Sequence, residues 1–310
     1  MLNFNMHILI KKISIAIVFQ TLSWATFSIV AVDTETGEVG SAGGSCIAGS
    51  VIISDIHINY GVIHTQSYYH TINQFNASSY MSQGYSPSQI IDLLIENDVS
   101  NNPAIRQYGI VDLTDNGRSA SFTGNQCSDW KGHLNGNTYA IQGNILLGPE
   151  ILDQMETNFL NTNGPLSHRL MAALQGAKVP GADTRCLDEG ISTLSSFIKV
   201  AKPDDNINNL YLDLNVNSVV SHYNQTGEWV DPIDSLQILY DNWLQSQIDG
   251  DIGDVNSDQI IDILDVVVII NFIMGNSLPN IEEQFLGDLN QDSIINIQDI
   301  ILIINIILIS

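Results

Sequence analysis

The chain has 310 residues, of which 44% are hydrophobic, so a sizeable core can form and global disorder is excluded. It carries 34 acidic and only 10 basic residues, which gives a formal net charge of −24. A surface this acidic repels nucleic-acid phosphates, which argues against a nucleic-acid partner. The acid excess leaves two interpretations open, a solvated acidic surface and the binding of cations.

The first 25 residues have the pattern of a secretory signal peptide. A short basic region precedes an apolar run at 13–22, and Ser23 and Ala25 are the small residues at positions −3 and −1 of a cleavage site. The run is too short to span a bilayer, and no later segment reaches a spanning length. We expect residues 1–25 to be removed, so that Thr26 begins a secreted chain that is extracellular, cell-surface or periplasmic. An uncleaved anchor is the alternative.

Residues 26–219 alternate between strand-like and helix-like segments. Strands are expected at 26–33, 38–53, 138–146 and 208–219, and a hairpin at 106–124, where the letters DNG are a strong turn signal. Helices are expected at 86–98, 148–162, 164–177 and 232–244, because each has a proline at its start and an amphipathic pattern after it. This order predicts a mixed α+β domain with an antiparallel sheet, and no nucleotide-binding motif is present.

The tail contains an internal duplication, in which a twelve-residue segment at 254–265 recurs at 288–299 and an apolar helix is expected after each. Oxygen-bearing side chains occupy positions one, three, five, nine and twelve, and position seven offers a backbone carbonyl; this is the ligand order of a calcium loop. The first loop offers Asp254, Asn256, Asp258, Ile260, Asp262 and Asp265, and the second offers Asp288, Asn290, Asp292, Ile294, Asn296 and Asp299. We expect about two calcium ions; magnesium fits less well, and an acidic turn pair without metal is the alternative.

Position six of each loop departs from the usual pattern. It is normally a glycine with a left-handed backbone, but here it is Gln259 in the first loop and Ser293 in the second. Each replacement is expected to cost about 1 kcal/mol in backbone strain and to lower the affinity for calcium.

Residues 251–310 contain a loop followed by a helix twice, with aspartate at position twelve of each loop. This arrangement resembles the type I dockerin module. The resemblance implies a small all-α calcium-binding domain, which we place at 248–310 after a polar hinge. It also implies a cohesin-like domain of a scaffold protein as partner, as in the cellulosomes of secreted polysaccharide-degrading enzymes. The implied cohesin contacts are positions ten and eleven, here Ile263, Leu264, Ile297 and Gln298. A calcium-stabilised cap that binds nothing in trans is the alternative.

The three cysteines, Cys46, Cys127 and Cys186, match no zinc-binding spacing. In an oxidising compartment one pair can bridge and leave one cysteine over. Buried free thiols are an equally good interpretation, and the sequence does not choose the pairing.

Four segments, at 26–43, 106–124, 127–152 and 166–186, resemble in their order the domain of unknown function 1028 family. That family is grouped with the N-terminal nucleophile hydrolases, so the resemblance implies a four-layer αββα sandwich, which we place at 26–247. In that superfamily the first residue of the mature chain attacks an amide carbonyl. Its own α-amine, with an ordinary pKa of about 7.7–8.0, serves as the base. The resemblance therefore implies Thr26 as the nucleophile.

Other residues are candidates for the same site. The backbone amides of Gly43 and Gly44 could form an oxyanion hole, and His133 and Asn144 could line a pocket. Superfamily members tune the amine with a nearby lysine and carboxylate, but the stretch at 41–46, where such groups are expected, has no charge. A structural role for His133 and an incidental place for Thr26 on its strand are the alternatives.

A further pair, Asp33 and Arg106, could be a buried ion pair or lie at the surface. Three functional hypotheses follow for the whole chain: an amide-bond hydrolase tethered by its dockerin, a non-catalytic binding or assembly protein on the same fold, and a component of a polysaccharide-degrading complex.

Overall fold

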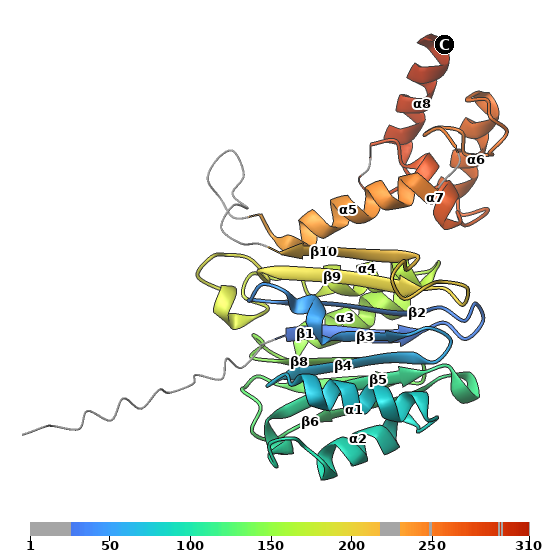
Figure 1. The fold of residues 1–310 in the computed structure, drawn as a ribbon. Coiled ribbons are helices and arrows are strands. Elements are labelled where there is room, and N and C mark those ends of the chain that lie inside the picture. The colour runs from blue at the N-terminus through green and yellow to red at the C-terminus, as the bar shows by residue number, and fades with distance from the viewer. Residues whose placement is uncertain (1–25, 218–229, 248–249, 291, 293, 310) are drawn as a thin grey trace, which may run out of the picture.

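The structure is a computed structural model that describes residues 26–217, 230–247, 250–290, 292 and 294–309 (Figure 1). The predicted signal peptide at 1–25 and Ser293 lie outside the described residues. Residues 26–217 and 230–247 form a domain with two antiparallel sheets, and three further helices follow among the described residues. The expectation of a mixed α+β domain with antiparallel pairing is confirmed.

The larger sheet has six strands in the order β10-β9-β2-β1-β8-β7, and every neighbouring pair is antiparallel. Its first strand lies near the middle of the sheet, between β2 and β8, so both of its edges are hydrogen-bonded. The strands are β1 (Thr26–Val32), β2 (Val39–Ser45), β7 (Gly132–Gly136), β8 (Tyr139–Asn144), β9 (Ser195–Ala201) and β10 (Leu212–Asn217).

The smaller sheet has four strands in the simple order β3-β4-β5-β6. They are β3 (Ser54–His57), β4 (Gly61–Ser67), β5 (Arg106–Asp112) and β6 (Arg118–Thr123). The last two form the predicted hairpin. Its turn holds Asp115, Asn116 and Gly117 at positive φ, which explains the sequence signal, because Asn, Asp and Gly tolerate that conformation best.

Helices cover the outer face of each sheet (Figure 1). Helices α1 (Thr71–Ser82) and α2 (Pro87–Glu96) pack on the four-stranded sheet through a cluster that includes Ile63, Ile90 and Ile110. Helices α3 (Glu150–Asn161), α4 (Leu166–Gly176) and α5 (Pro232–Gln247) pack on the six-stranded sheet through the largest cluster, which includes Phe27 and Phe159. The two sheets face each other between these helix layers.

Several elements have no counterpart in the sequence prediction. Helix α1 was missed because its buried residues are Asn73, Ala77 and Met81, a face with little apolar periodicity. Strands β3, β4, β7 and β9 were missed as well. By contrast, α2 begins where expected, because the Ser86 hydroxyl accepts the Gln89 amide and the Gln89 side chain accepts the Ser86 amide in return.

The C-terminal helices are α6 (Ile263–Ile273), α7 (Ile281–Gly287) and α8 (Ile297–Ile309). The first and last are the two helices predicted after the calcium loops, and α7 was not predicted. They share a small apolar cluster of Val255, Val266, Ile269, Ile300 and Ile303. In the described part of the chain, no helix is long and apolar enough to cross a membrane.

Candidate functional site

The start of β1 places Thr26 at one end of the six-stranded sheet. Thr26 pairs with Asn144 on β8, and the register of β1 on β2 sets Ser45 opposite it on the other side. Side chains alternate along a strand, so Thr26 shares a face with Ser28, whose hydroxyl contacts Gln66 of the opposite sheet. The Thr26 side chain therefore points into the layer between the sheets, where the residue is 1% exposed.

The layer between the sheets is apolar at one end and polar at the end that holds Thr26. The apolar end is a cluster that includes Val30, Val39, Val62 and Val111. The polar end, which we call the polar inter-sheet zone, consists of Thr26, Ser28, Ser45, His64, Gln66, Gln107, Gln142 and Asn144, all at most 1% exposed. Burying so many polar groups is unfavourable unless they are hydrogen-bonded, so this zone is a candidate site.

Gln66 connects Thr26 to both sheets. Its Nε2 donates to the Thr26 carbonyl at 3.2 Å and to Gln107 Oε1 at 2.8 Å. Its Oε1 accepts from the Ser28 hydroxyl at 2.6 Å, and that hydroxyl accepts from Gln142 Nε2 at 2.6 Å. This chain of carboxamides fixes the backbone of Thr26 relative to the four-stranded sheet.

His64 lies in the same zone as a neutral imidazole, because its complete burial lowers its pKa to about 3. Three atoms here, His64 Nε2, Gln142 Oε1 and Asn144 Oδ1, are buried without a hydrogen-bond partner among the described residues. Each such group destabilises the fold by about 1–3 kcal/mol. Unsatisfied buried polar groups are more typical of a functional site than of a core.

Asn144 and His133 are placed differently with respect to Thr26. Asn144 is its direct strand neighbour, and Asn144 Nδ2 donates to Gln107 Oε1 at 3.1 Å. His133 is exposed on β7, and its Nδ1 lies 2.8 Å from the Thr123 hydroxyl, which accepts from Gln107 Nε2 at 2.9 Å. His133 thus reaches the polar inter-sheet zone only through the Thr123 hydroxyl.

The oxyanion-hole prediction for Gly43 and Gly44 needs correction. Both residues lie on β2, an inner strand that pairs with β1 on one side and β9 on the other. Their amides are engaged in the sheet and are unavailable to a substrate. Packing explains the glycines instead, because a Cβ on Gly43 would lie 2.9 Å from the Ser28 Cβ, and one on Gly44 would lie 2.8 Å from the Phe27 ring.

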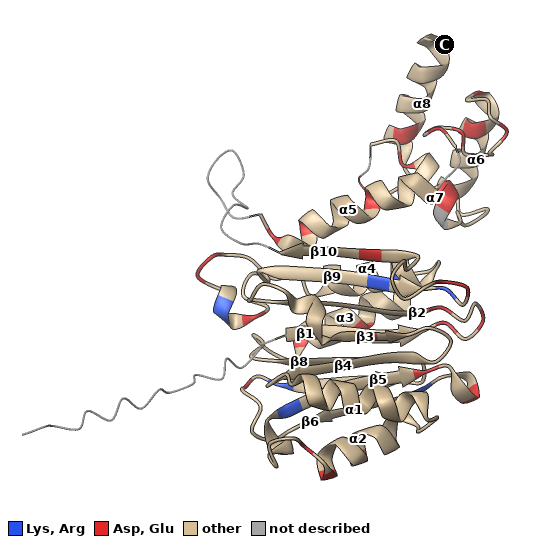
Figure 2. Ribbon diagram, in the orientation of Figure 1, with Lys and Arg blue, Asp and Glu red and all other residues tan. Residues whose placement is uncertain are grey.

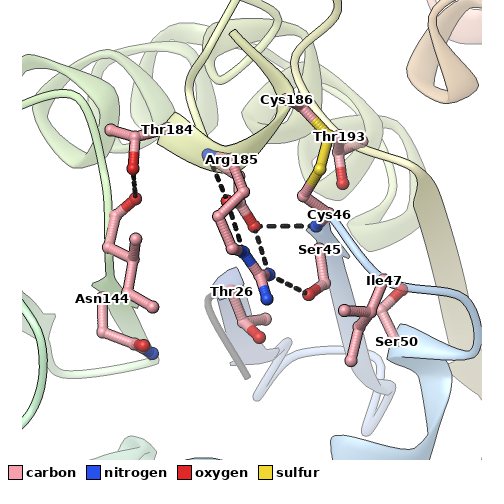
Figure 3. A network of polar contacts seen from close by, with 12 residues as sticks. Thr26, Ser45, Cys46, Ile47, Ser50, Asn144, Thr184, Arg185, Cys186 and Thr193 are labelled. Carbon is pink, nitrogen blue, oxygen red and sulfur yellow. Dashed lines mark hydrogen bonds and ion pairs between the residues drawn. A yellow bond between two sulfur atoms is a disulfide. The ribbon is translucent and has the colours of Figure 1, made fainter. Parts of the chain in front are cut away.

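A charged pair from a distant part of the chain lies next to Thr26 (Figure 3). The Asp183 carboxylate is fully buried and accepts from Arg185 Nε at 3.0 Å and Nη2 at 2.8 Å. The same carboxylate accepts from the Cys46 amide at 2.7 Å. Arg185 Nη2 lies 3.4 Å from the Ser45 hydroxyl, and Figure 3 shows the guanidinium pointing toward Thr26.

The cysteine pairing that the sequence left open is Cys46 with Cys186, and Cys127 is a buried free thiol. The disulfide joins the end of β2 to the short turn that carries Arg185. Of the two alternatives left open for Asp33 and Arg106, a mutual ion pair is not the one that forms. Arg106 is bound to Asp98, and Asp33 accepts backbone amides in the turn after β1.

The two calcium loops repeat the same hydrogen bonds. In the first loop, Asp254 at position one accepts the amides of positions five and six, and Asp265 at position twelve accepts those of positions three and nine. In the second, Asp288 accepts the amide of position five, and Asp299 accepts those of positions three and nine. At the described positions, the duplication in sequence is therefore also a duplication of these hydrogen bonds.

The loop residues fit a hard cation. Asp254, Asp265 and Asp299 are at most 3% exposed, and none of them takes part in an ion pair among the described residues. Buried carboxylates without a cationic side chain are strongly unfavourable, and a bound divalent ion would compensate them. In the described parts of the chain, no three Asp, Glu, His or Cys side chains converge as a ready-made cluster.

Two family models match the chain. A family of unknown function, DUF1028, matches residues 26–224, and the type I dockerin domain matches residues 252–308. The first match covers more than half of the chain. The chain belongs to the DUF1028 family.

The DUF1028 domain of this chain resembles a solved structure. The crystal structure of protein SPO2555 from Silicibacter pomeroyi, with the DUF1028 family model, matches with a TM-score of 0.56 and 24% sequence identity. The match covers 70% of this chain and 88% of that chain, and at this identity it concerns the fold alone. No curated protein is similar enough to count as a match.

The DUF1028 domain is followed by a type I dockerin domain, as the duplicated loops predicted. Type I dockerins typically bind calcium. A dockerin also implies a cohesin as partner and a place in an extracellular, cellulosome-type complex.

Proposed function

We propose that this protein is a secreted component of a cellulosome-type assembly, held there by its dockerin. The repeated hydrogen-bond pattern of the two loops supports the proposal. Positions ten and eleven of the two loops are the first residues of α6 and α8. Ile263, Leu264 and Ile297 at these positions are 54–63% exposed. Large apolar side chains that gather on the surface of a small module are typical of an interaction site.

The test is calcium-dependent capture of the secreted chain on a panel of type I cohesins. We expect binding to at least one cohesin in millimolar calcium and loss of that binding with a chelator. The double variant Asp265→Ala/Asp299→Ala should lose binding. Asp153→Ala, at an exposed position of α3 in the other domain, should bind like the unaltered chain. Capture that is unchanged by the chelator, or by the double variant, would refute the proposal.

We further propose that the DUF1028 domain is an amide-bond hydrolase of the N-terminal nucleophile type. The order of helices, sheet, sheet and helices supports the four-layer αββα arrangement of that superfamily. Thr26 lies in the polar inter-sheet zone, next to the half-buried Arg185 and its buried partner Asp183. Superfamily members tune the catalytic amine with a nearby cationic side chain and a carboxylate. The second strand carries no such groups at 41–46, and Arg185 and Asp183 are candidates for them.

In the proposed reaction Thr26 Oγ1 attacks the amide carbonyl, and the Thr26 α-amine takes the hydroxyl proton and passes it to the leaving amine. Water then hydrolyses the ester that remains. Arg185 and Asn144 replace Gly43 and Gly44 as candidates to stabilise the oxyanion.

Thr26→Ala is expected to lower hydrolysis by about a thousand-fold or more, since the nucleophile is lost, whereas Thr26→Ser should keep part of the activity. Activity is measured on a panel of acyl p-nitroanilides, and labelling on an acylating β-lactone followed by mass spectrometry. N-terminal sequencing of the secreted chain should give Thr26. A different first residue, or a fully active Thr26→Ala variant, would sink the proposal and favour a binding or assembly role for this domain.

A further inference from the structure

The disulfide is directly adjacent in sequence to two of the residues that surround Thr26. Cys46 follows Ser45, and Cys186 follows Arg185. The bond joins residues 140 positions apart, so one covalent link connects the end of β2 to the segment that supplies the guanidinium. Figure 3 shows the disulfide, Arg185 and Ser45 on the same side of Thr26.

Asp183 makes the second connection between the same two segments. Its carboxylate accepts the Cys46 amide on the β2 side, and the amide, Nε and Nη2 of Arg185 on the other side. Because Asp183 is fully buried, each of these charge-assisted bonds is stronger than it would be in water.

The segment that carries Arg185 is anchored just before that residue and less firmly after it. The Thr184 amide donates to the Ile145 carbonyl and the Leu147 amide to the Ala182 carbonyl, whereas the backbone hydrogen bonds of residues 185–190 stay within 183–190 among the described residues. Between α4 and β9 it contains a single three-residue 3-10 turn, and Leu187 beyond that turn is 51% exposed. The apolar cluster beneath it consists of Cys46, Cys186 and Ile191, with Leu194 packed against them. The disulfide therefore provides most of this small core and ties residues 185–190 to the end of β2, so these residues open more readily when the tie is lost.

We propose that the Cys46–Cys186 disulfide and Asp183 form a clamp that positions Arg185 and Ser45 at Thr26, so that the site is complete only in the oxidised chain. Reduction by a dithiol breaks the S–S bond, gives each cysteine sulfur a proton, and leaves the reductant as its own cyclic disulfide. The loop is then free to withdraw Arg185 from Thr26. The catalytic meaning of the clamp rests on the proposed function, but the clamp itself does not.

The test is proton exchange at the arginine Nε–H groups of the secreted full-length chain, followed by NMR. In the oxidised chain Arg185 Nε–H should be protected by Asp183. In the double variant Cys46→Ala/Cys186→Ala, and in the chain reduced by dithiothreitol, its exchange should become at least tenfold faster. Arg106 and Arg118, bound to Asp98 and Asp112 elsewhere in the domain, serve as internal references and should be unchanged.

A matched pair of variants tests the carboxylate. Asp183→Asn should accelerate exchange at Arg185 alone, and Asp112→Asn should accelerate it at Arg118 alone. Unchanged protection of Arg185 without the disulfide would overturn the clamp. Equal loss at all three arginines would overturn it too, because the disulfide would then hold the whole domain.

Labelling by the β-lactone separates the clamp from the proposed function. If Thr26 is labelled in the oxidised chain, the clamp predicts at least tenfold slower labelling after reduction. If Thr26 is never labelled, the hydrolase proposal fails, and the exchange measurement still decides whether the clamp exists.

Discussion

Replacing Asp98 by alanine is expected to lower the free energy of unfolding of the DUF1028 domain by about 3–5 kcal/mol, the usual effect of breaking a buried ion pair. The Arg106 guanidinium is its partner, with Nε 2.8 Å from the carboxylate, and Arg106 is only 4% exposed. Without Asp98 this positive charge stays buried with no counter-charge. The Asn73 side chain and the amides of Ser100 and Asn102 lose their acceptor as well.

The same carboxyl predicts a loss of stability in acid. Burial alone would raise its pKa, but hydrogen bonds from Arg106, Asn73 and two backbone amides outweigh burial and lower the pKa to about 2. A group with a lowered pKa in the folded state stabilises the fold above its unfolded pKa of about 3.9. This contribution, about 2 kcal/mol, is lost as the pH falls from about 4 to 2.

Urea unfolding of Asp98→Ala and of the unaltered chain, at neutral pH and at pH values between about 2 and 4, measures both effects. Asp112→Ala is the matched control, because its partner Arg118 is 31% exposed and a pair near the surface contributes about 1 kcal/mol or less. An equal decrease in the free energy of unfolding of the two variants would show that burial does not make the Asp98 pair more stabilising than the Asp112 pair.

The fold was predictable where the chain carries strong local signals. The hairpin at Asp115–Gly117, the capping box of α2 and the duplicated loops each rest on a few residues whose chemistry selects one conformation. Helix α1 and strand β4 lack such signals. Strand β4 is buried along its whole length although it contains His64, Thr65 and Gln66, so its place depends on tertiary contacts.

The site was predictable only in part, for a related reason. Thr26 was identified from the leader pattern, and Asn144 from its segment, but the charged groups were sought on the second strand. They come instead from Asp183 and Arg185, which only the folded chain brings to Ser45. Gln66 and Gln107 were missed because a buried carboxamide in a strand has no sequence signature that separates it from a solvent-facing one.

The acid excess has a partial explanation in the fold. Figure 2 shows acidic residues, in red, on the loops before α6 and α8 as well as on turns at the edges of the main domain. The dockerin loops hold buried acids, Asp254, Asp265 and Asp299, beside exposed ones, Asp258 and Asp292. The buried acids are the part of the excess that the cation-binding interpretation concerns, and that interpretation stays a prediction.

Chelation of calcium is expected to unfold the dockerin while the DUF1028 domain stays folded. The dockerin core is a small cluster around Val266, Ile269 and Ile303, and a module of about 60 residues buries too little apolar surface to be stable without a further tie. Calcium at a thousand times its dissociation constant contributes about 4 kcal/mol per site, comparable to the whole stability of such a module.

Calorimetry should therefore show two unfolding transitions in millimolar calcium. With a chelator, the dockerin transition should disappear or its temperature should fall strongly. Asp299→Ala, which removes a ligand of one of the two sites, should lower that temperature by about half as much. Gln259→Gly is the informative control, because Gln259 has a φ of 68° at position six. Glycine adopts this conformation without strain, so the variant should be about 1 kcal/mol more stable and bind calcium about fivefold more tightly. If the temperature of the dockerin transition does not depend on calcium in any of the three proteins, the prediction is contradicted. The helices would then stabilise the loops without a bound ion.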